Sequence, residues 1–128
     1  MEGIIIDKNY GKLKEANPMI TIAANCKRIR FNADLVEAMG LSSEYKVCVY
    51  NLLGKYYLLR GKEESYFNLA AEGRKKQGRP MFCINSASLA DFLIKSIKYE
   101  RMKGKNIYLK VKKTGSEYRG ETLFEIDY

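Results

Sequence analysis

A chain of 128 residues with 46% hydrophobic content has the size and composition of one globular domain, or of two interlocked halves, and is not typical of a disordered protein. Its net charge of +8 favours nucleic acid or another polyanion as a partner, although many small globular proteins are this basic for solubility alone. No apolar run approaches the roughly 20 residues that span a bilayer, and the first residues, MEGIIID, lack the apolar stretch of a signal peptide, so we expect a cytoplasmic protein without a membrane segment.

The residue types that carry most enzymatic and metal chemistry are scarce. The chain has no histidine, which is the usual general base and a common metal ligand. Its three cysteines, Cys26, Cys48 and Cys83, are too widely spaced for a metal site and are expected to be reduced thiols. The stretch from Gly73 to Gly78 lacks the lysine and hydroxyl residue of a phosphate-binding loop. We therefore expect no enzyme, no metal and no cofactor.

The first half of the chain predicts two strands, a short helix and a hairpin. Apolar alternation indicates two strands within residues 19–31. Asn32 is a favoured N-cap and Gly40 suits the left-handed position that ends helices, so the helix between them has about two turns. Alternation resumes over residues 46–60, and a turn at residues 52–54 divides this stretch into a hairpin.

The second half repeats this order of elements. Strands at residues 66–70 and 81–84 flank a polar loop at residues 72–80. A helix then follows, and its start is marked by a capping box from Ser88 to Asp91, with Ser86 as an alternative cap; its apolar stripe comprises Leu89, Phe92, Leu93 and Ile97.

The second hairpin is predicted from alternation after a basic stretch that ends at Gly104. Strands are expected at residues 107–111 and 122–126, with a turn at residues 113–116. Tyr108 lies on the polar side of the first of these strands.

The recurring order predicts an internal duplication, with repeat units at residues 18–60 and 65–127. Aligning Leu35 with Leu89 places Asn32 opposite Ser86. Aligning Asn32 with Asn85 instead requires a one-residue insertion. The alternative to both alignments is chance similarity of two short amphipathic segments. Neither unit is large enough to bury its own apolar face, so the two must pack together. We expect a mainly β fold with short helices (β/α+β), in which two tandem strand–helix–β-hairpin units form a single interlocked domain over residues 1–128. This is a pseudo-dimer within one chain, which leaves a further homodimer possible.

The first unit resembles the AbrB/MazE/SpoVT family of swapped-hairpin DNA-binding domains. That family has a strand, a short helix ending in Leu-Gly-apolar, a polar turn and a hairpin; here the corresponding residues run from Arg28 to Leu35, then through Met39-Gly40-Leu41, and over residues 47–60. The second unit is similar only in its pattern. The resemblance implies a pseudo-twofold, barrel-like core in which the hairpins are exchanged between units. It also implies DNA contacts from arginines near the strand–turn–helix region, where Arg28 matches.

Two basic clusters precede the strand that enters the helix of each unit. They are the candidate nucleic-acid-binding residues: Lys27, Arg28 and Arg30 in the first unit, and Arg74, Lys75, Lys76 and Arg79 in the second. Related by a pseudo-twofold axis, they would form one surface for successive phosphates. The alternative is a pair of solvated loop tips. A third basic set lies at and after the end of the second helix, where cations complement the helix dipole: Lys95, Lys98, Arg101, Lys103 and Lys105.

Two functions are consistent with these patterns. The first is a small DNA-binding transcriptional regulator or antitoxin-like protein without catalysis. Its tyrosines, such as Tyr56-Tyr57 or Tyr108, are candidates for stacking on bases, although strands favour tyrosine in any case. The second is a phage- or mobile-element-type structural or protein-interaction module that keeps the fold without DNA binding. Val36 and Glu37 stand where DNA-binding members of the family often carry arginine, which favours this alternative, and Leu52-Leu53 offers an apolar hairpin tip for a protein partner.

Overall fold

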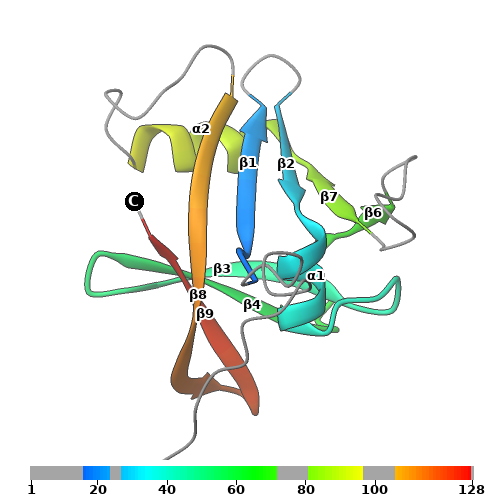
Figure 1. Ribbon diagram of the computed structural model, residues 1–128, viewed down its shortest axis with the longest axis vertical. Helices are drawn as coiled ribbons and strands as arrows, with labels where there is room; N and C mark the ends of the chain where they lie inside the picture. The colour runs from blue at the N-terminus through cyan, green and yellow to red at the C-terminus, as the bar shows by residue number, and fades with distance from the viewer. Residues whose placement is uncertain (1–15, 24–26, 72–80, 97–105, 128) are drawn as a thin grey trace, which may run out of the picture.

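The computed structural model describes residues 16–23, 27–71, 81–96 and 106–127, and they form a mainly β fold with two short helices (Figure 1). In chain order the elements are β1 (Met19–Ala23), β2 (Arg28–Phe31), α1 (Ala33–Met39), β3 (Lys46–Leu52), β4 (Lys55–Gly61), β5 (Phe67–Asn68), β6 (Ala70–Ala71), β7 (Phe82–Asn85), α2 (Ala87–Ser96), β8 (Asn106–Tyr118) and β9 (Glu121–Asp127). Neither helix has the length and apolar character needed to cross a membrane, within the part of the chain described.

All strands belong to one antiparallel sheet that nearly closes into a barrel. Its order is β5-β3-β4-β9-β8-β1-β2-β7-β6. The two ends of this order are neighbours in sequence, because β5 and β6 are separated only by Leu69. The segment from β5 to β6 therefore pairs with β3 at one end and with β7 at the other, and this brings the two edges of the sheet together.

Helix α1 begins and ends where the sequence predicts. Asn32 has an extended backbone, and its side-chain oxygen accepts a hydrogen bond from the Leu35 amide at 2.9 Å, as an N-cap does. Gly40 adopts the left-handed conformation with φ of 63°, and the amide of Leu41 then donates to the carbonyl of Val36 at 2.9 Å. This closes a helix of seven residues, which is too short to be stable without tertiary contacts.

Helix α2 begins two residues earlier than the predicted capping box. Its cap is Ser86, the alternative, whose hydroxyl accepts a hydrogen bond from the Leu89 amide at 3.2 Å. The capping box from Ser88 to Asp91 is therefore wrong, and Asp91 instead forms an ion pair with Lys27. The predicted apolar stripe holds for Leu89 and Leu93, which are buried, but is wrong for Phe92, which is 45% exposed; Ile97 lies outside the described residues.

Both long hairpins end in two-residue turns with positive φ angles. Leu53 and Gly54 have φ of 52° and 82°, and Arg119 and Gly120 have φ of 55° and 79°. Such turns match the right-handed twist of the strands they join. The turn predicted at residues 113–116 is wrong because β8 runs on to Tyr118.

An irregularity in the pairing of β8 with β9 explains the misplaced turn. The register shifts between Lys113 and Glu117, so the polar residues that suggested a turn instead form a bulged part of the strand. The hydroxyl of Thr114 donates to the carbonyl of Leu123 at 2.7 Å across this region.

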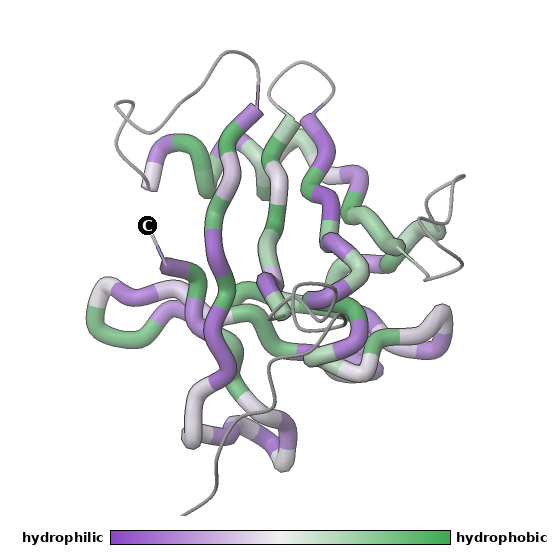
Figure 2. The backbone as a smooth tube through the Cα atoms, viewed as in Figure 1, coloured by the Kyte–Doolittle hydropathy of each residue, from purple (hydrophilic) through white to green (hydrophobic). Residues whose placement is uncertain are grey.

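The core lies inside the barrel, and along β1, β2 and β8 it is built mainly from alternating residues, whereas β4, β7 and β9 bury adjacent residues. Ile20 and Ile22 of β1, Ile29 and Phe31 of β2, and Ile107, Leu109 and Val111 of β8 are all buried. Figure 2 shows the same alternation as changes between hydrophobic and hydrophilic colour along these strands. Because successive residues of a strand face opposite sides, the residues between these core positions point out of the barrel.

Candidate nucleic-acid interface

Strand β2 directs two of the predicted arginines outward. Its buried residues, Ile29 and Phe31, face the core, so Arg28 and Arg30 lie on the outer side, where Arg30 is exposed. The strand is held on both sides, by β1 and by β7. The arginines therefore project from the middle of a sheet and not from a loop.

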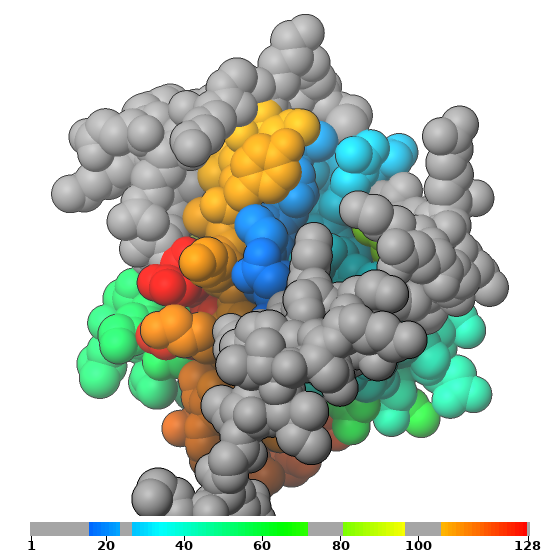
Figure 3. Space-filling model, in the orientation of Figure 1, coloured from blue at the N-terminus to red at the C-terminus, as the bar shows by residue number. Residues whose placement is uncertain are grey.

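The neighbouring strands extend this surface. Thr21 of β1 lies opposite Arg30 on one side and opposite Tyr108 of β8 on the other, so the three share one row on the outer face. Lys110 follows two residues later on β8 and points the same way. We call Arg28, Arg30, Tyr108 and Lys110 the basic face. Figure 3 shows this side of the molecule, with β8, β1 and β2 next to one another.

The dimensions and composition of the basic face suit a polyanion. Adjacent strands lie about 4.8 Å apart, so β2 and β8 are separated by about 10 Å across β1. Tyr108 is 53% exposed, which is unusual for a large aromatic side chain. The outward residues of these three strands that are described and not buried carry no carboxylate up to Lys110; they are Met19, Thr21, Arg28, Arg30, Asn106, Tyr108 and Lys110. On the adjoining strand β9, Asp127 lies opposite Lys110 and marks the acidic edge of this face.

Arg28 is oriented by a neighbour on β7. Its Nε donates to the side-chain oxygen of Asn85 at 2.9 Å, and the two residues lie opposite each other in the pairing of β2 with β7. This bond uses one of the five N–H donors of the guanidinium group, so the group can still bind a phosphate in a fixed orientation.

Lys27 is drawn toward α2 and away from the basic face. It has φ of 51°, and its Nζ lies 2.7 Å from Oδ1 of Asp91. The two side chains are 42% and 48% exposed, so the ion pair contributes at most about 1 kcal/mol. The ion pair mainly fixes the position of Lys27, because it connects the start of β2 to α2.

The second predicted cluster lies outside the described residues: Arg74, Lys75, Lys76 and Arg79. Of the third basic set, Lys95 lies in the last turn of α2, as predicted from the helix dipole, and the others fall outside the described residues. Val36 is buried in the core, so packing explains its apolar side chain.

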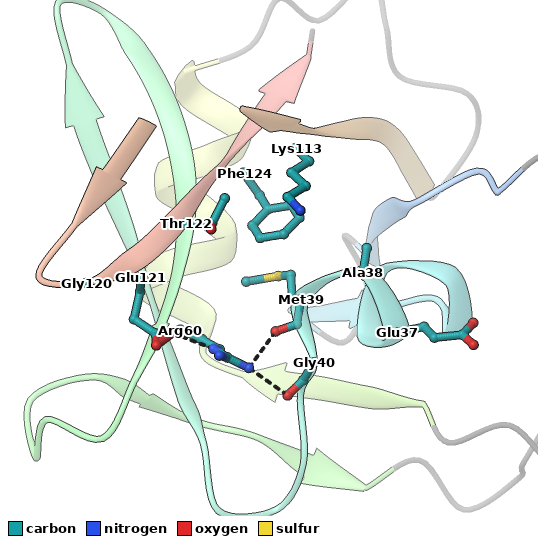
Figure 4. Close-up of a pocket in the computed structure, with 10 residues that line it drawn as sticks. All are labelled: Glu37, Ala38, Met39, Gly40, Arg60, Lys113, Gly120, Glu121, Thr122 and Phe124. Carbon is teal, nitrogen blue, oxygen red and sulfur yellow. Dashed lines mark hydrogen bonds and ion pairs between the residues drawn. The ribbon is translucent and has the colours of Figure 1, made fainter. Parts of the chain in front are cut away.

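The sequence did not indicate a second cluster, in which Arg60 contacts a carboxylate, two carbonyl groups and a tyrosine ring. Figure 4 shows its contacts with Glu121, Met39 and Gly40. The Nε of Arg60 bonds to Glu121, and one terminal nitrogen donates to the carbonyl oxygens of Met39 and Gly40 at 3.0 Å each. The guanidinium also lies 4.5 Å from the ring centre of Tyr45. Glu121, through its hydrogen bond, raises the pKa of Arg60 further above its ordinary value. All these contacts are internal, so Arg60 is a structural residue.

Tyrosines gather beyond Arg60, near the tip of the β8–β9 hairpin. The rings of Tyr50 and Tyr118 stack with centres 4.7 Å apart, and Arg119 lies 5.3 Å from the centre of the Tyr118 ring. Nearby, burial raises the pKa of the Cys48 thiol, while a hydrogen bond with Tyr66 opposes this rise. The stacked rings of Tyr50 and Tyr118 join the β3–β4 hairpin to the β8–β9 hairpin. The guanidinium of Arg119 already lies against one of these rings.

The described residues contain no group of three or more Cys, Asp or Glu side chains that could hold a metal ion. Cys48 and Cys83 are free thiols, as expected from their spacing. The chain matches no protein-family model, no curated protein and no solved structure. The functional conclusion therefore depends on the geometry of the basic face.

Proposed function

We propose that the protein is a small DNA-binding protein, a transcriptional regulator or antitoxin-like module, that binds without catalysis through the basic face. One observation carries the proposal: β1 pairs with both β2 and β8, which aligns Arg28 and Arg30 with Tyr108 and Lys110 on one outward surface. Arginine and lysine neutralise phosphates without regard to base sequence. They fix the position of the protein on the duplex, whereas sequence is read by contacts to base edges.

The proposal includes a tandem architecture of the AbrB/MazE/SpoVT type, with units at residues 18–60 and 65–127 related by a pseudo-twofold axis. The helix caps support it. The alignment that places Asn32 opposite Ser86 also places Ala33 opposite Ala87, which are the first residues of α1 and α2. The same alignment superposes β2 on β7.

The strand pairing supports the same relation. β2 pairs with β7 and β4 with β9, so strands in equivalent positions are antiparallel partners, as a twofold axis between them requires. Leu58 lies opposite Phe124, and aligning these two residues also aligns the turns at Leu53–Gly54 and Arg119–Gly120. The β8–β9 hairpin pairs with β1, and the β3–β4 hairpin pairs with β5, which is the exchange that swapped hairpins make.

A second candidate function is a protein-interaction module that retains this fold. Leu53 favours it, because its side chain is 95% exposed at the tip of the β3–β4 hairpin. Its neighbour Leu52 is 44% exposed, so the two leucines together give the tip an apolar surface for a protein partner.

Binding of a short labelled DNA duplex, followed by fluorescence anisotropy over a range of salt concentrations, tests the first function. We expect the double variant Arg30→Gln/Lys110→Gln to bind about tenfold more weakly at low salt, and its salt dependence to fall by about one to two units of slope, since each lost phosphate contact contributes about 0.9. Arg28→Gln adds to the loss.

A charge-matched control separates local contact from total charge. Lys55→Gln/Lys62→Gln removes the same number of positive charges from positions away from the basic face. Equal losses in the two double variants would show that only net charge matters. Absence of duplex binding by the intact protein at low salt would refute the function. Because the chain has no tryptophan, the 260/280 nm absorbance ratio after purification at low salt also reports bound nucleic acid.

A further inference from the structure

Tyr108 holds an aromatic ring at the surface of the basic face. Its side chain is 53% exposed, although Ile107 and Leu109 on either side of it are buried and fix the strand. The side-chain amide of Asn106 donates to the Tyr108 hydroxyl at 3.4 Å, so the ring leans along β8 and does not stand straight out from the sheet. A ring in this position covers the sheet with one face and leaves the other face to solvent, which agrees with its exposed fraction. Figure 3 shows the first half of β8 at the surface on this side of the molecule.

Several other tyrosine rings already have a partner. Tyr50 stacks on Tyr118. The guanidinium of Arg60 lies 4.5 Å from the ring centre of Tyr45. Within the described part of the chain, by contrast, no ring stacks on Tyr108 and no cation lies over it. Its outer face is therefore available to a planar group of a ligand.

The surroundings of this ring favour an anionic ligand. Lys110 follows two residues along β8, about 7 Å away, and Arg30 lies two strands across the sheet, about 10 Å away. In the row that joins Arg30 to Tyr108, the residue between them is Thr21, which is too small to separate them. An aromatic ring flanked by cations suits a nucleotide, because the base stacks on the ring while the backbone carries the negative charge.

The breadth of the sheet distinguishes a single strand from a duplex. The row that begins at Tyr108 runs across β8, β1, β2, β7 and β6, through Thr21, Arg30 and Cys83 to Ala70. With about 4.8 Å between neighbouring strands, this row is about 19 Å wide. The major groove of B-DNA is about 12 Å wide and admits a helix or a two-stranded ribbon. The basic face therefore meets a duplex at its phosphates, and the paired bases, whose faces are stacked on one another, stay out of reach of Tyr108.

We propose that Tyr108 stacks on an unpaired base, so that the basic face binds single-stranded nucleic acid more tightly than duplex. The proposal rests on the nucleic-acid-binding function proposed above and adds the way in which the face contacts a base. Lys110 and Arg30 bind phosphates on either side of the stacked base. Every base has a flat π face, so this contact selects an unpaired strand and not a particular sequence.

Fluorescence anisotropy at low salt with two labelled probes tests the proposal: an oligothymidylate of about 12 nucleotides and its duplex with oligoadenylate. We expect the wild-type protein to bind the single strand more tightly. Tyr108→Ala should weaken single-strand binding about 5- to 100-fold, as the loss of one stacked base does, and change duplex binding by less than about twofold. Tyr108→Phe keeps the ring and should bind both probes as the wild type does. An oligouridylate of the same length distinguishes the source of the strand, since equal or tighter binding supports stacking and assigns the strand to RNA.

Lys110→Gln is the matched control, because it removes a phosphate contact from the same strand and should weaken binding of both probes alike. Tyr108→Thr keeps a residue that strands favour, so it repeats the loss of the ring in a variant that folds. A ring-deleted variant that retains single-strand affinity, or that loses affinity for both probes equally, would overturn the proposal and leave the DNA-binding function standing. Duplex binding by the wild type as tight as single-strand binding would do the same. Single-strand binding without duplex binding would support stacking while refuting the duplex-binding function, and binding of neither probe would overturn both.

Discussion

Replacement of Arg60 by alanine tests how the barrel holds its first helix. Arg60 of β4 donates to the last carbonyl groups of α1, at Met39 and Gly40, and pairs with Glu121 at the start of β9. It also lies against the ring of Tyr45. One side chain of β4 thus connects a helix that is too short to be stable alone with β9, which lies 61 residues further along the chain.

The expected cost follows from these contacts. Two hydrogen bonds contribute about 1 kcal/mol each, and a partly exposed ion pair contributes up to about 1 kcal/mol. The cation–π contact adds about 0.5 to 1 kcal/mol. Water partly replaces the lost bonds, because Arg60 is 30% exposed and its contact with Gly40 is at the surface. We therefore expect Arg60→Ala to lower the free energy of unfolding by about 2 to 3 kcal/mol, with a fall in Tm of about 6 to 12 °C.

Urea and thermal unfolding, followed by circular dichroism, measure the change. Arg60→Lys keeps the charge and loses the planar fork, so it should recover only part of the stability. Lys55→Ala is the control, because its ion pair with Glu125 joins atoms 3.4 Å apart and Lys55 is mostly exposed; it should cost less than about 0.5 kcal/mol. The reasoning is refuted if Arg60→Ala costs no more than this control, or if lysine restores full stability.

Two further predictions concern helix caps and the buried thiol. Ser86→Ala should lower the free energy of unfolding in urea by about 1 kcal/mol, because it removes one cap. Asn32→Ala should lower it by about 2 kcal/mol, because Asn32 caps α1 and also accepts a hydrogen bond from the Met19 amide of β1 at 3.1 Å. Equal losses in the two variants would contradict the role of that second bond. Burial raises the pKa of Cys48 in the folded protein, so its contribution to stability is present below the ordinary thiol pKa of about 8.5 and is lost as the pH rises through the higher folded value. Unfolding measured from pH 7 to pH 10 should show a steeper loss for the wild type than for Cys48→Ala, and parallel curves would refute this.

Much of the local structure was predictable because its signals are local. Asn32 and Gly40 mark the ends of α1 through their own side-chain and backbone preferences, and the structure confirms both. The outward direction of Arg28 and Arg30 follows from the burial of the residues between them, since strands alternate with a period of two. The failures occurred where a local pattern offered two solutions. Ser86 and Ser88 are both acceptable caps, and the structure uses Ser86.

The second hairpin shows the same limit. The polar residues at 113–116 and the pair Arg119-Gly120 both permit a turn, but only the pair is used, and the register shift in β8 absorbs the earlier residues. A bulge depends on which residues lie opposite in the partner strand, so the sequence of one strand does not reveal it.

The sequence by itself indicated the alternation of core and outward residues in β1, β2 and β8, because alternation is a property of each strand. It also indicated Arg28 and Arg30 as candidates. Only the tertiary structure decided that β1 lies between β2 and β8, and hence that Arg30 shares a row with Tyr108 from the far end of the chain. It likewise turned Lys27 toward Asp91. The physical reason is that strand neighbours depend on how distant segments close the barrel together, and that choice is made by their joint packing and not by the pattern of any one of them.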